Sequence, residues 1–259
     1  MPPTFTPTPT NTLGPPTPTP TETPNLIDGL IAYYPLDGNA NDESRNGYHG
    51  VAGSKVTYDS GRIGLVAKFD GSKDSYIEIE DRLNMGTDEF TISAWIMADN
   101  YAQTAKIINK GQAGVGNPPQ VGYSLRFLNL SEDKALRFDI VDHSRADDPI
   151  NRDTIAKIPS NELPINEFLL ITGVLRRSSG NGANLDLYVN GELKSSTHTT
   201  ELTSLDTDLS FAIGALKRTP SYDASEVFNG LIDDVRIYNR PLSKSEIQTL
   251  YVAGQRGSP

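Results

Sequence analysis

The sequence predicts an all-β protein, a sandwich or a barrel, with one short helix near its C-terminal end. Three observations support this prediction. From residue 26 onwards, short runs of alternating apolar and polar residues are separated by clusters of Gly, Asn, Asp and Pro, a spacing expected of such folds. The dipeptide Asn190-Gly191 lies between LDLYV (185–189) and ELKSS (192–196) and indicates a tight β-hairpin. Helical periodicity is nearly absent before residue 241.

Each predicted strand is a run of apolar and β-branched residues bounded by turn residues. In order along the chain, these runs are 30–36, 65–69, 75–80, 90–97, 105–109, 123–129, 135–141, 168–177, 184–190, 209–215 and 231–238. The run 90–97 is apolar on both faces of a strand, because Ile92, Ala94 and Ile96 alternate with Ser93, Trp95 and Met97. We therefore expect this strand to be central, with Trp95 in the core.

The last element is expected to be a helix over residues 241–251. Ser243 and Glu246 have the spacing of a capping box. An apolar stripe follows, made of Leu242, Ile247, Leu250 and Tyr251. The helix should be about two turns long and lie on the sandwich as a lid.

The chain divides into segments of unlike composition. Residues 2–24 contain nine prolines and nine threonines, so we expect residues 1–25 to be an extended linker. Residues 26–254 are expected to form one sandwich domain, and 255–259 a tail. Linkers of this kind typically tether extracellular modules, so we expect a secreted or cell-surface protein with neighbouring domains. The first residues lack the apolar core of a signal peptide, which indicates a segment of something longer.

The charge balance excludes several classes of partner. The formal net charge is −10 and there is no cysteine. Binding to nucleic acid or anionic lipid needs clustered Lys and Arg, and no apolar run approaches the roughly 18 residues that cross a bilayer. Disulfides and thiolate chemistry are excluded as well. We therefore expect a cation or a neutral polar ligand rather than nucleic acid or a membrane.

Four motifs together carry a family resemblance. They are YYPLDGNANDESRNGYHG (33–50), LYVNGE (187–192), FAIGA (211–215) and FNGLIDDVRIYNRPLSKSEIQTLY (228–251). In this order the chain resembles laminin-G-like domains of the concanavalin A-like lectin/glucanase superfamily over residues 30–251. The resemblance implies a jelly roll of two antiparallel sheets, with roughly six or seven strands each and the first and last strands adjacent.

The resemblance also implies a structural calcium ion near residues 37–50, the opening loop. Ca²⁺ takes oxygen ligands from Asp, Asn and backbone carbonyls, and the role is carried over to Asp37, Asn39, Asp42 and Asp233. Strand alternation puts Asp233 on one face with Val235 and Ile237, where a carboxylate is costly unless it is paired or bound to a metal. In the alternative interpretation the Asp and Asn side chains only cap backbone donors of the loop.

Sugar binding generally combines an aromatic ring with polar hydrogen-bonding groups. If the sandwich is ordered as in the family, loop residues could meet around one rim: Tyr101, His143, Arg145 and Tyr222. In the alternative interpretation these residues are loop-packing side chains or solvated charges. His49, His143 and His198 share no element at ligand spacing, so zinc is not expected.

The leading hypothesis is a secreted, non-catalytic module that binds glycans or glycoproteins, or serves adhesion, and is stabilised by calcium. The main alternative is a structural or protein-interaction module that binds no sugar. A third is a divergent glycosidase, since Glu78 and Glu80 share a strand face at a spacing that an inverting pair tolerates. The family's Glu-x-Asp-x-x-Glu pattern is not completed, because Leu83 stands where its last carboxylate belongs.

Overall fold

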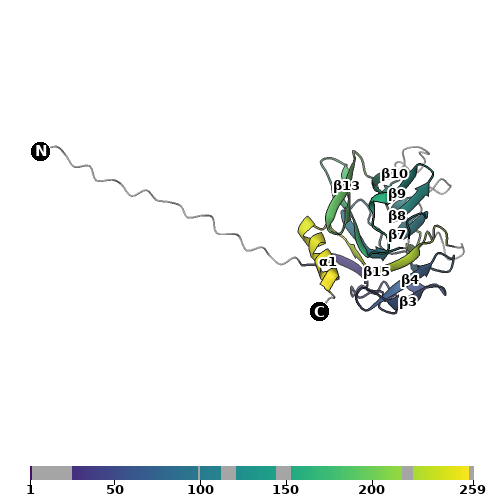
Figure 1. Ribbon diagram of the computed structural model, residues 1–259. Coiled ribbons are helices and arrows are strands. Elements are labelled where there is room, and N and C mark those ends of the chain that lie inside the picture. The colour runs from purple at the N-terminus through teal and green to yellow at the C-terminus, as the bar shows by residue number, and fades with distance from the viewer. Residues whose placement is uncertain (2–24, 99, 112–120, 144–152, 218–223, 257–259) are drawn as a thin grey trace.

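The protein is a two-sheet β-sandwich. The computed structural model describes residue 1 and residues 25–98, 100–111, 121–143, 153–217 and 224–256. Within these residues two antiparallel sheets pack on each other, and one α-helix lies outside them (Figure 1). The antiparallel sandwich predicted from the sequence is confirmed. Most of the predicted linker, and also Arg145 and Tyr222, lie outside the described residues.

The first sheet has eight strands. They are β1 (Leu30–Tyr34), β3 (Thr57–Ser60), β4 (Leu65–Asp70), β6 (Phe90–Met97), β11 (Leu169–Arg177), β12 (Ala183–Val189), β13 (Glu192–Thr199) and β15 (Asn229–Tyr238). Their order is β13-β12-β11-β6-β15-β4-β3, and β1 pairs with β15. The first and last strands are thus neighbours, as the family resemblance implied.

The second sheet has seven strands in the order β10-β9-β8-β7-β14-β5-β2. They are β2 (Val51–Ala52), β5 (Ile77–Ile79), β7 (Ala105–Gly111), β8 (Gly122–Leu130), β9 (Asp133–Val141), β10 (Asp153–Pro159) and β14 (Phe211–Ile213). A short 3₁₀ helix, η1 (Ser160–Glu162), follows β10. The sequence did not predict β2, β3 or β10.

The main core lies between the sheets. Ile92 and Ile96 of β6 belong to it together with Phe138 of β9, and all three are buried. Phe90 meets Phe138 edge to face, with ring centroids 6.0 Å apart. Burial of each such side chain contributes about 1.5–3 kcal/mol, so this interface supplies most of the stability.

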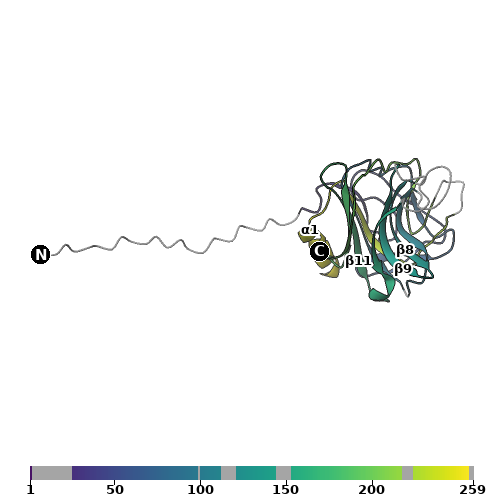
Figure 2. The ribbon, with the colours of Figure 1, turned by 90° about the horizontal axis from the view of Figure 1, so that it is seen from above.

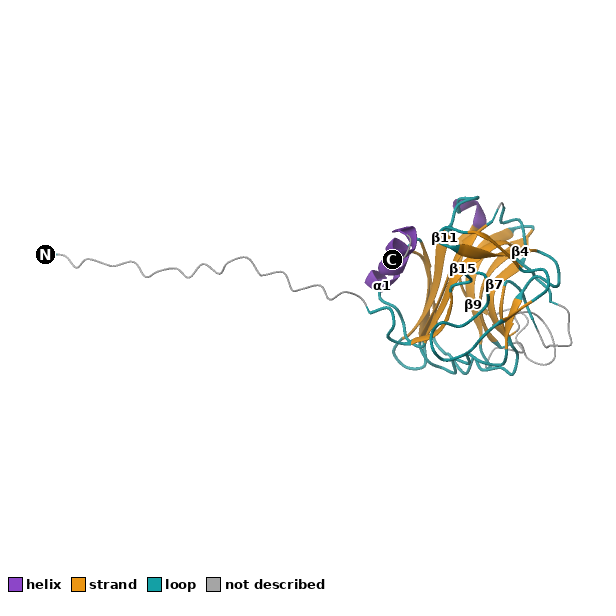
Figure 3. Ribbon diagram, turned by 90° about the horizontal axis from the view of Figure 1, so that it is seen from below, coloured by secondary structure: helices purple, strands orange, loops and turns teal. Residues whose placement is uncertain are grey.

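Helix α1 (Lys244–Arg256) covers the outer face of the first sheet (Figures 2 and 3). A second apolar cluster joins its Ile247 and Leu250 to Trp95, and Trp95 is fully buried, as predicted. The Ser243–Glu246 capping box is confirmed by reciprocal hydrogen bonds. The helix is 13 residues long, longer than expected, and enters the predicted tail. It is too short to cross a bilayer, and no other helix among the described residues could do so.

The Asn190-Gly191 hairpin is also confirmed. Strands β12 and β13 pair on either side of it, and both residues have positive φ, 52° and 80°. This is the backbone that a type I′ turn requires.

Strand β15 carries a β-bulge between Asp233 and Arg236, and Asp234 has a φ of 52°. Before the bulge β15 pairs with β4, and after it with β1. Asp233 lies opposite Trp95, on the side of helix α1, whereas Val235 belongs to the main core. The predicted shared face of Asp233 and Val235 is wrong, because the bulge adds a residue and reverses the alternation.

Candidate functional site

The opening loop is organised around Asp42. Its Oδ1 accepts the backbone N–H groups of Tyr33 at 3.0 Å and Ser44 at 2.8 Å, and its Oδ2 accepts the N–H of Tyr48 at 3.0 Å. Burial alone would raise the pKa of this carboxyl, but these donors hold it below its ordinary value. Asp42 therefore ties Ser44 and Tyr48 of the loop to β1.

The same loop fixes the orientation of His49. The backbone N–H of Asp42 donates to Nδ1 of His49 at 3.1 Å, so the neutral ring carries its proton on Nε2. Next to it, the hydroxyl of Tyr34 donates to the carbonyl of Tyr48 at 2.7 Å. Asn39 closes an Asx turn by accepting the N–H of Asn41 at 2.8 Å.

A cleft of about 470 Å³ lies between the opening loop, the bulge of β15 and helix α1. We call it the α1 cleft. Its wall includes apolar side chains of Leu26, Leu30, Ile63 and Leu250, and both Asp37 and Asp233 line it. The structure thus brings these two predicted site residues to one cavity, whereas Asn39 and Asp42 are not among its lining residues.

Charged and polar groups at the α1 cleft form a network centred on Asp234. Asp234 accepts the Tyr33 hydroxyl at 2.7 Å and pairs with Arg236 at 3.1 Å. Arg62 pairs with the same carboxylate at 3.5 Å and stacks over Trp95 at 3.8 Å from the ring centroid.

Asp233 lies beside this network and is 2% exposed. Burial, then the carboxylate of Asp234, and further Asp37 raise its pKa to about 7, although Arg62 opposes the shift. The cleft therefore contains a buried carboxylate that a cation would stabilise in its charged form.

The predicted calcium ligands fit the ion only in part. Asp37 and Asp233 share the cleft, but Oδ1 of Asp37 already accepts the N–H of Leu65 at 2.7 Å. The carboxylate of Asp42 and the amide oxygen of Asn39 are engaged by backbone donors. No cluster of three or more His, Cys, Asp or Glu suited to a metal occurs in the described part of the chain. Two carboxylates fall short of the six to eight oxygens that Ca²⁺ takes.

The predicted sugar-binding rim is not assembled by the described residues. Tyr101 is 5% exposed, its ring stacks on Phe127 at 4.6 Å, and its hydroxyl donates to the carbonyl of Pro164 at 2.7 Å. The ring therefore offers no face to a sugar. His143 is exposed, and its Nε2 lies 3.1 Å from the carbonyl oxygen of Asp206.

A more open groove of about 630 Å³ lies beside β5, where residues 47–49 at the end of the opening loop line it. We call it the β5 groove. Its lining includes Tyr48, His49, Val51, Glu78, Asp208 and Ser210. Glu78 accepts the hydroxyl of Ser210 at 2.8 Å. The sequence pointed to Glu78 but not to a binding role for His49, because the Asp42 contact that orients His49 appears only in the fold.

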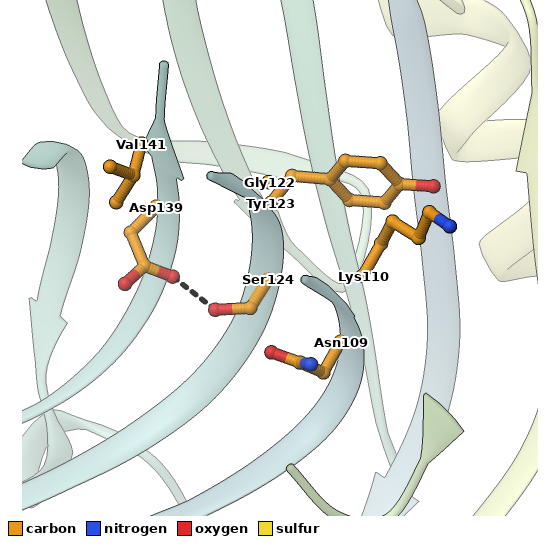
Figure 4. A pocket seen from close by; sticks show the side chains of 7 residues that line it. All are labelled: Asn109, Lys110, Gly122, Tyr123, Ser124, Asp139 and Val141. Carbon is orange, nitrogen blue, oxygen red and sulfur yellow. Dashed lines mark hydrogen bonds between the residues drawn. The ribbon is translucent and has the colours of Figure 1, made fainter. Parts of the chain in front are cut away.

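A row of buried polar residues crosses β7, β8 and β9 on the side away from the core. Ser124 donates to Asp139, Arg126 pairs with Asp139 at 2.7 Å, and Lys106 donates to Ser124 at 3.1 Å. Figure 4 shows Ser124, Asp139 and Asn109 pointing to the same side, around a cavity of about 10 Å³, room for about one water. These polar residues connect the three strands. Along each strand they alternate with core residues, and this alternation is a sequence signal that could have revealed them.

Similar structures are domains with the same sandwich. No curated protein sequence matches the chain. The binding domain of Paraclostridial Mosquitocidal Protein 1 is 19% identical, with a TM-score of 0.66 over 88% of this chain and 52% of that one. The botulinum neurotoxin serotype D ligand binding domain in complex with N-acetylneuraminic acid is 20% identical, with a TM-score of 0.62 over 88% of this chain and 51% of that one. This chain thus spans about half the length of those two.

A third similar structure is domain 4 of AbnA, a GH43 extracellular arabinanase from Geobacillus stearothermophilus, in complex with arabinotriose. It is 22% identical, with a TM-score of 0.57 over 86% of this chain and 98% of that domain. Sequence identities of 19–22% to these three structures show a shared fold and no more. The sequence itself gives the family, because the profile described as "Concanavalin A-like lectin/glucanases superfamily" matches residues 70–248, more than half of the chain. The chain therefore belongs to the concanavalin A-like lectin/glucanase superfamily.

Proposed function

We propose that the protein is a non-catalytic, secreted module that binds carbohydrate or glycoconjugates and belongs to a larger extracellular protein. The β5 groove carries this proposal. It is open and lined by hydroxyl, imidazole and carboxylate groups, and its volume lies within the roughly 300–1,000 Å³ of ligand sites. Two similar structures hold sugars, arabinotriose in one and N-acetylneuraminic acid in the other, which supports a glycan ligand.

A glycan array tests this function with the full chain. Neutral and acidic glycans are printed together, and binding is measured in buffer with Ca²⁺ and in buffer with EDTA. The proposal expects specific, saturable binding to one class of glycan. An array on which no glycan binds in either buffer would overturn it.

The proposed calcium site keeps only two of the four protein ligands that the sequence analysis named. We propose that Asp37 and Asp233 hold a Ca²⁺ ion in the α1 cleft, with backbone or ligand oxygens completing its shell. A ligand bound only by the folded state stabilises it by about 2.7 kcal/mol at 100 times its Kd. EDTA should therefore lower the melting temperature of the wild type, and excess Ca²⁺ should restore it. An unchanged melting temperature and no metal by elemental analysis would refute the ion.

A second candidate function is interaction with another protein. A cavity of about 400 Å³ lies between η1, β13 and α1. Three exposed apolar residues are sequence neighbours of residues that line it: Ile165, Leu193 and Val252. Exposed apolar side chains mark an interaction surface where they gather into one patch, and such a surface here would support a protein partner. Light scattering at high concentration tests self-association, and Leu193→Ser should weaken any oligomer. A monomer at every concentration would argue against it.

Glycoside hydrolysis is the remaining alternative. Glu80 is exposed and Glu78 is bonded to Ser210, whereas a glycosidase needs one carboxylic acid held protonated by its surroundings. We therefore expect no release of reducing sugar from β-glucans. Activity that is present in the wild type and lost in Glu78→Gln would show the module to be an enzyme.

A further inference from the structure

The β5 groove has the chemistry to distinguish between classes of sugar. We propose that it binds neutral oligosaccharides and disfavours acidic ones, with His49 and Glu78 as contact residues. This rests on the proposed carbohydrate-binding function and adds the site and the ligand class to it.

His49 presents a directed donor at the groove. Because the backbone N–H of Asp42 donates to Nδ1, the neutral ring keeps its proton on Nε2. The carboxylate of Asp42 also holds the adjacent Tyr48 N–H at 3.0 Å, and Asp42 is itself 5% exposed. The donor is therefore fixed by a buried group before any ligand arrives, which lowers the ordering cost of binding.

Glu78 supplies the matching acceptor. Its Oε1 accepts the Ser210 hydroxyl at 2.8 Å, and Ser210 is 7% exposed. The described residues offer its second oxygen no hydrogen-bond partner. A carboxylate held in this way accepts hydrogen bonds from sugar hydroxyls, and such charge-assisted bonds are stronger than neutral ones.

An apolar contact completes the arrangement. Val51 lies directly opposite Glu78 across the β2–β5 pair, and its side chain is 73% exposed. Tyr48, which also lines the groove, is half-buried. Sugars pack their C–H faces on such groups while their hydroxyls bond to polar neighbours.

The charge of the groove sets the ligand class. Glu78, Glu80, Asp81 and Asp208 line it, with Arg82 as the cation among the lining residues. The buried Lys110 forms an ion pair with Asp81, with 2.6 Å between Nζ and Oδ1, and neutralises this carboxylate. The remaining excess of negative charge repels carboxylates. Sialic or uronic acids are therefore disfavoured, whereas uncharged polyols are not.

Calorimetric titration of the full chain tests the proposal. The neutral probes are arabinotriose, cellotriose, xylotriose and mannotriose, and the acidic probes are 3′-sialyllactose and trigalacturonic acid. Pentalysine probes the competing possibility that the groove binds basic peptides. We expect at least one neutral probe to bind and the acidic probes to bind at least about tenfold more weakly.

Two variants locate the site. Glu78→Gln removes the charged acceptor, and His49→Asn removes the Nε2 donor while its amide oxygen can still accept the Asp42 N–H. Each should weaken binding of the neutral probe about tenfold or more, at an unchanged melting temperature. The matched controls are Glu201→Gln and His198→Ala, which are exposed and outside the groove, and should stay within about twofold.

The outcomes separate this inference from the proposed function. If a neutral probe binds and both groove variants bind it as well as the controls do, the site is elsewhere and this inference fails alone. Binding restricted to acidic probes or to pentalysine also overturns it. If neither these probes nor the glycan array gives binding to the wild type, the proposed function fails and this inference with it.

Discussion

The carboxylate of Asp42 accepts the backbone N–H of Tyr33 at 3.0 Å, so the opening loop is fastened to the strand that precedes it. The same side chain accepts two further N–H groups of the loop. The backbone N–H of Asp42 also donates to Nδ1 of His49, which lines the β5 groove, whereas Asp37 at the α1 cleft accepts the N–H of Leu65. Asp42 thus connects β1 to the part of the loop that borders the β5 groove.

Replacing Asp42 should destabilise the protein. Asp42→Ala removes the acceptor of three backbone donors, and hydrogen bonds to a charged group contribute about 1.5–3 kcal/mol each, although not additively. We expect a loss of about 3 kcal/mol in the free energy of unfolding at pH 7, measured by urea titration. Because the donors lower the pKa of Asp42, its contribution is present above its ordinary pKa and is lost as the pH falls below it.

The control for this prediction is Glu43→Ala. Glu43 is an exposed neighbour in the same loop and should change the stability by less than about 0.5 kcal/mol. If Asp42→Ala behaved like the control, the loop would owe its shape to other contacts.

Asp233 should make stability depend on pH with the opposite sign. Its folded-state pKa is raised to about 7, above the unfolded value, so the folded state holds the proton more tightly. The contribution of Asp233 to stability should therefore be full below about pH 4 and decline as the pH rises to about 7. Asp233→Asn should remove this decline and be more stable than the wild type at pH 8 by up to a few kcal/mol.

This measurement belongs in EDTA, because a bound cation would hold Asp233 charged and cancel the effect. Asp88→Asn, an exposed substitution, serves as the control and should retain the wild-type pH profile. A wild-type stability that is flat between pH 4 and pH 8 in EDTA would contradict the raised pKa.

The sequence predicted strands well where apolar alternation is long. The run 90–97 matches β6 residue for residue, because a strand covered on both faces is apolar throughout. Strands β2 and β3 were not predicted, since they are short, exposed edge strands held by pairing partners rather than by their own composition. Their pairing is long-range information that local patterns lack.

The candidate sites could be predicted only in part for a similar reason. The adjacency of β1 and β15 brings Asp37 and Asp233 to one cavity, and the family motifs implied that adjacency. The bulge at Asp234 gave no signal in the alternation, because an Asp with positive φ looks like any other Asp in sequence. Tyr101 stacks on Phe127, a partner 26 positions away, so its burial depends on tertiary packing.

The cap of helix α1 should be sensitive to acid. Burial alone would raise the pKa of Glu246, but Arg240 and Ser243 lower it to about 2. Its stabilisation is therefore present above about pH 4.5 and is lost as the pH falls towards 2. Glu246→Gln should lower the free energy of unfolding by about 1 kcal/mol at pH 7, and the difference from the wild type should vanish near pH 2.

The matched variant for this cap is Glu201→Gln, which is exposed and away from the helix. Arg240 also donates to the carbonyl of Asp28 at 2.8 Å, so Glu246→Gln should loosen the segment that enters β1. Hydrogen exchange at residues 27–30 can detect this. A Glu246→Gln penalty that persists unchanged at pH 2 would show that packing, rather than charge, is lost.

Gly254 should be intolerant of a side chain although it lies in a helix. Alanine is normally favoured over glycine in helices by about 1 kcal/mol, but a Cβ on Gly254 would lie 2.5 Å from Cζ2 of Trp95. The ring is buried and stacks on Tyr251, so it has little room to move. We expect Gly254→Ala to destabilise the protein by about 1–3 kcal/mol, and Gln255→Ala, an exposed neighbour, to have no such effect.

The chain offers a direct readout of this contact, because Trp95 is its single tryptophan. Undocking of α1 would expose the ring and shift its fluorescence to longer wavelength. If the clash is the cause, Trp95→Phe should make room for the Cβ, and Gly254→Ala should cost less in that background than in the wild type. An equal cost in both backgrounds would place the strain elsewhere in the helix and leave the close approach of Gly254 to Trp95 without energetic consequence.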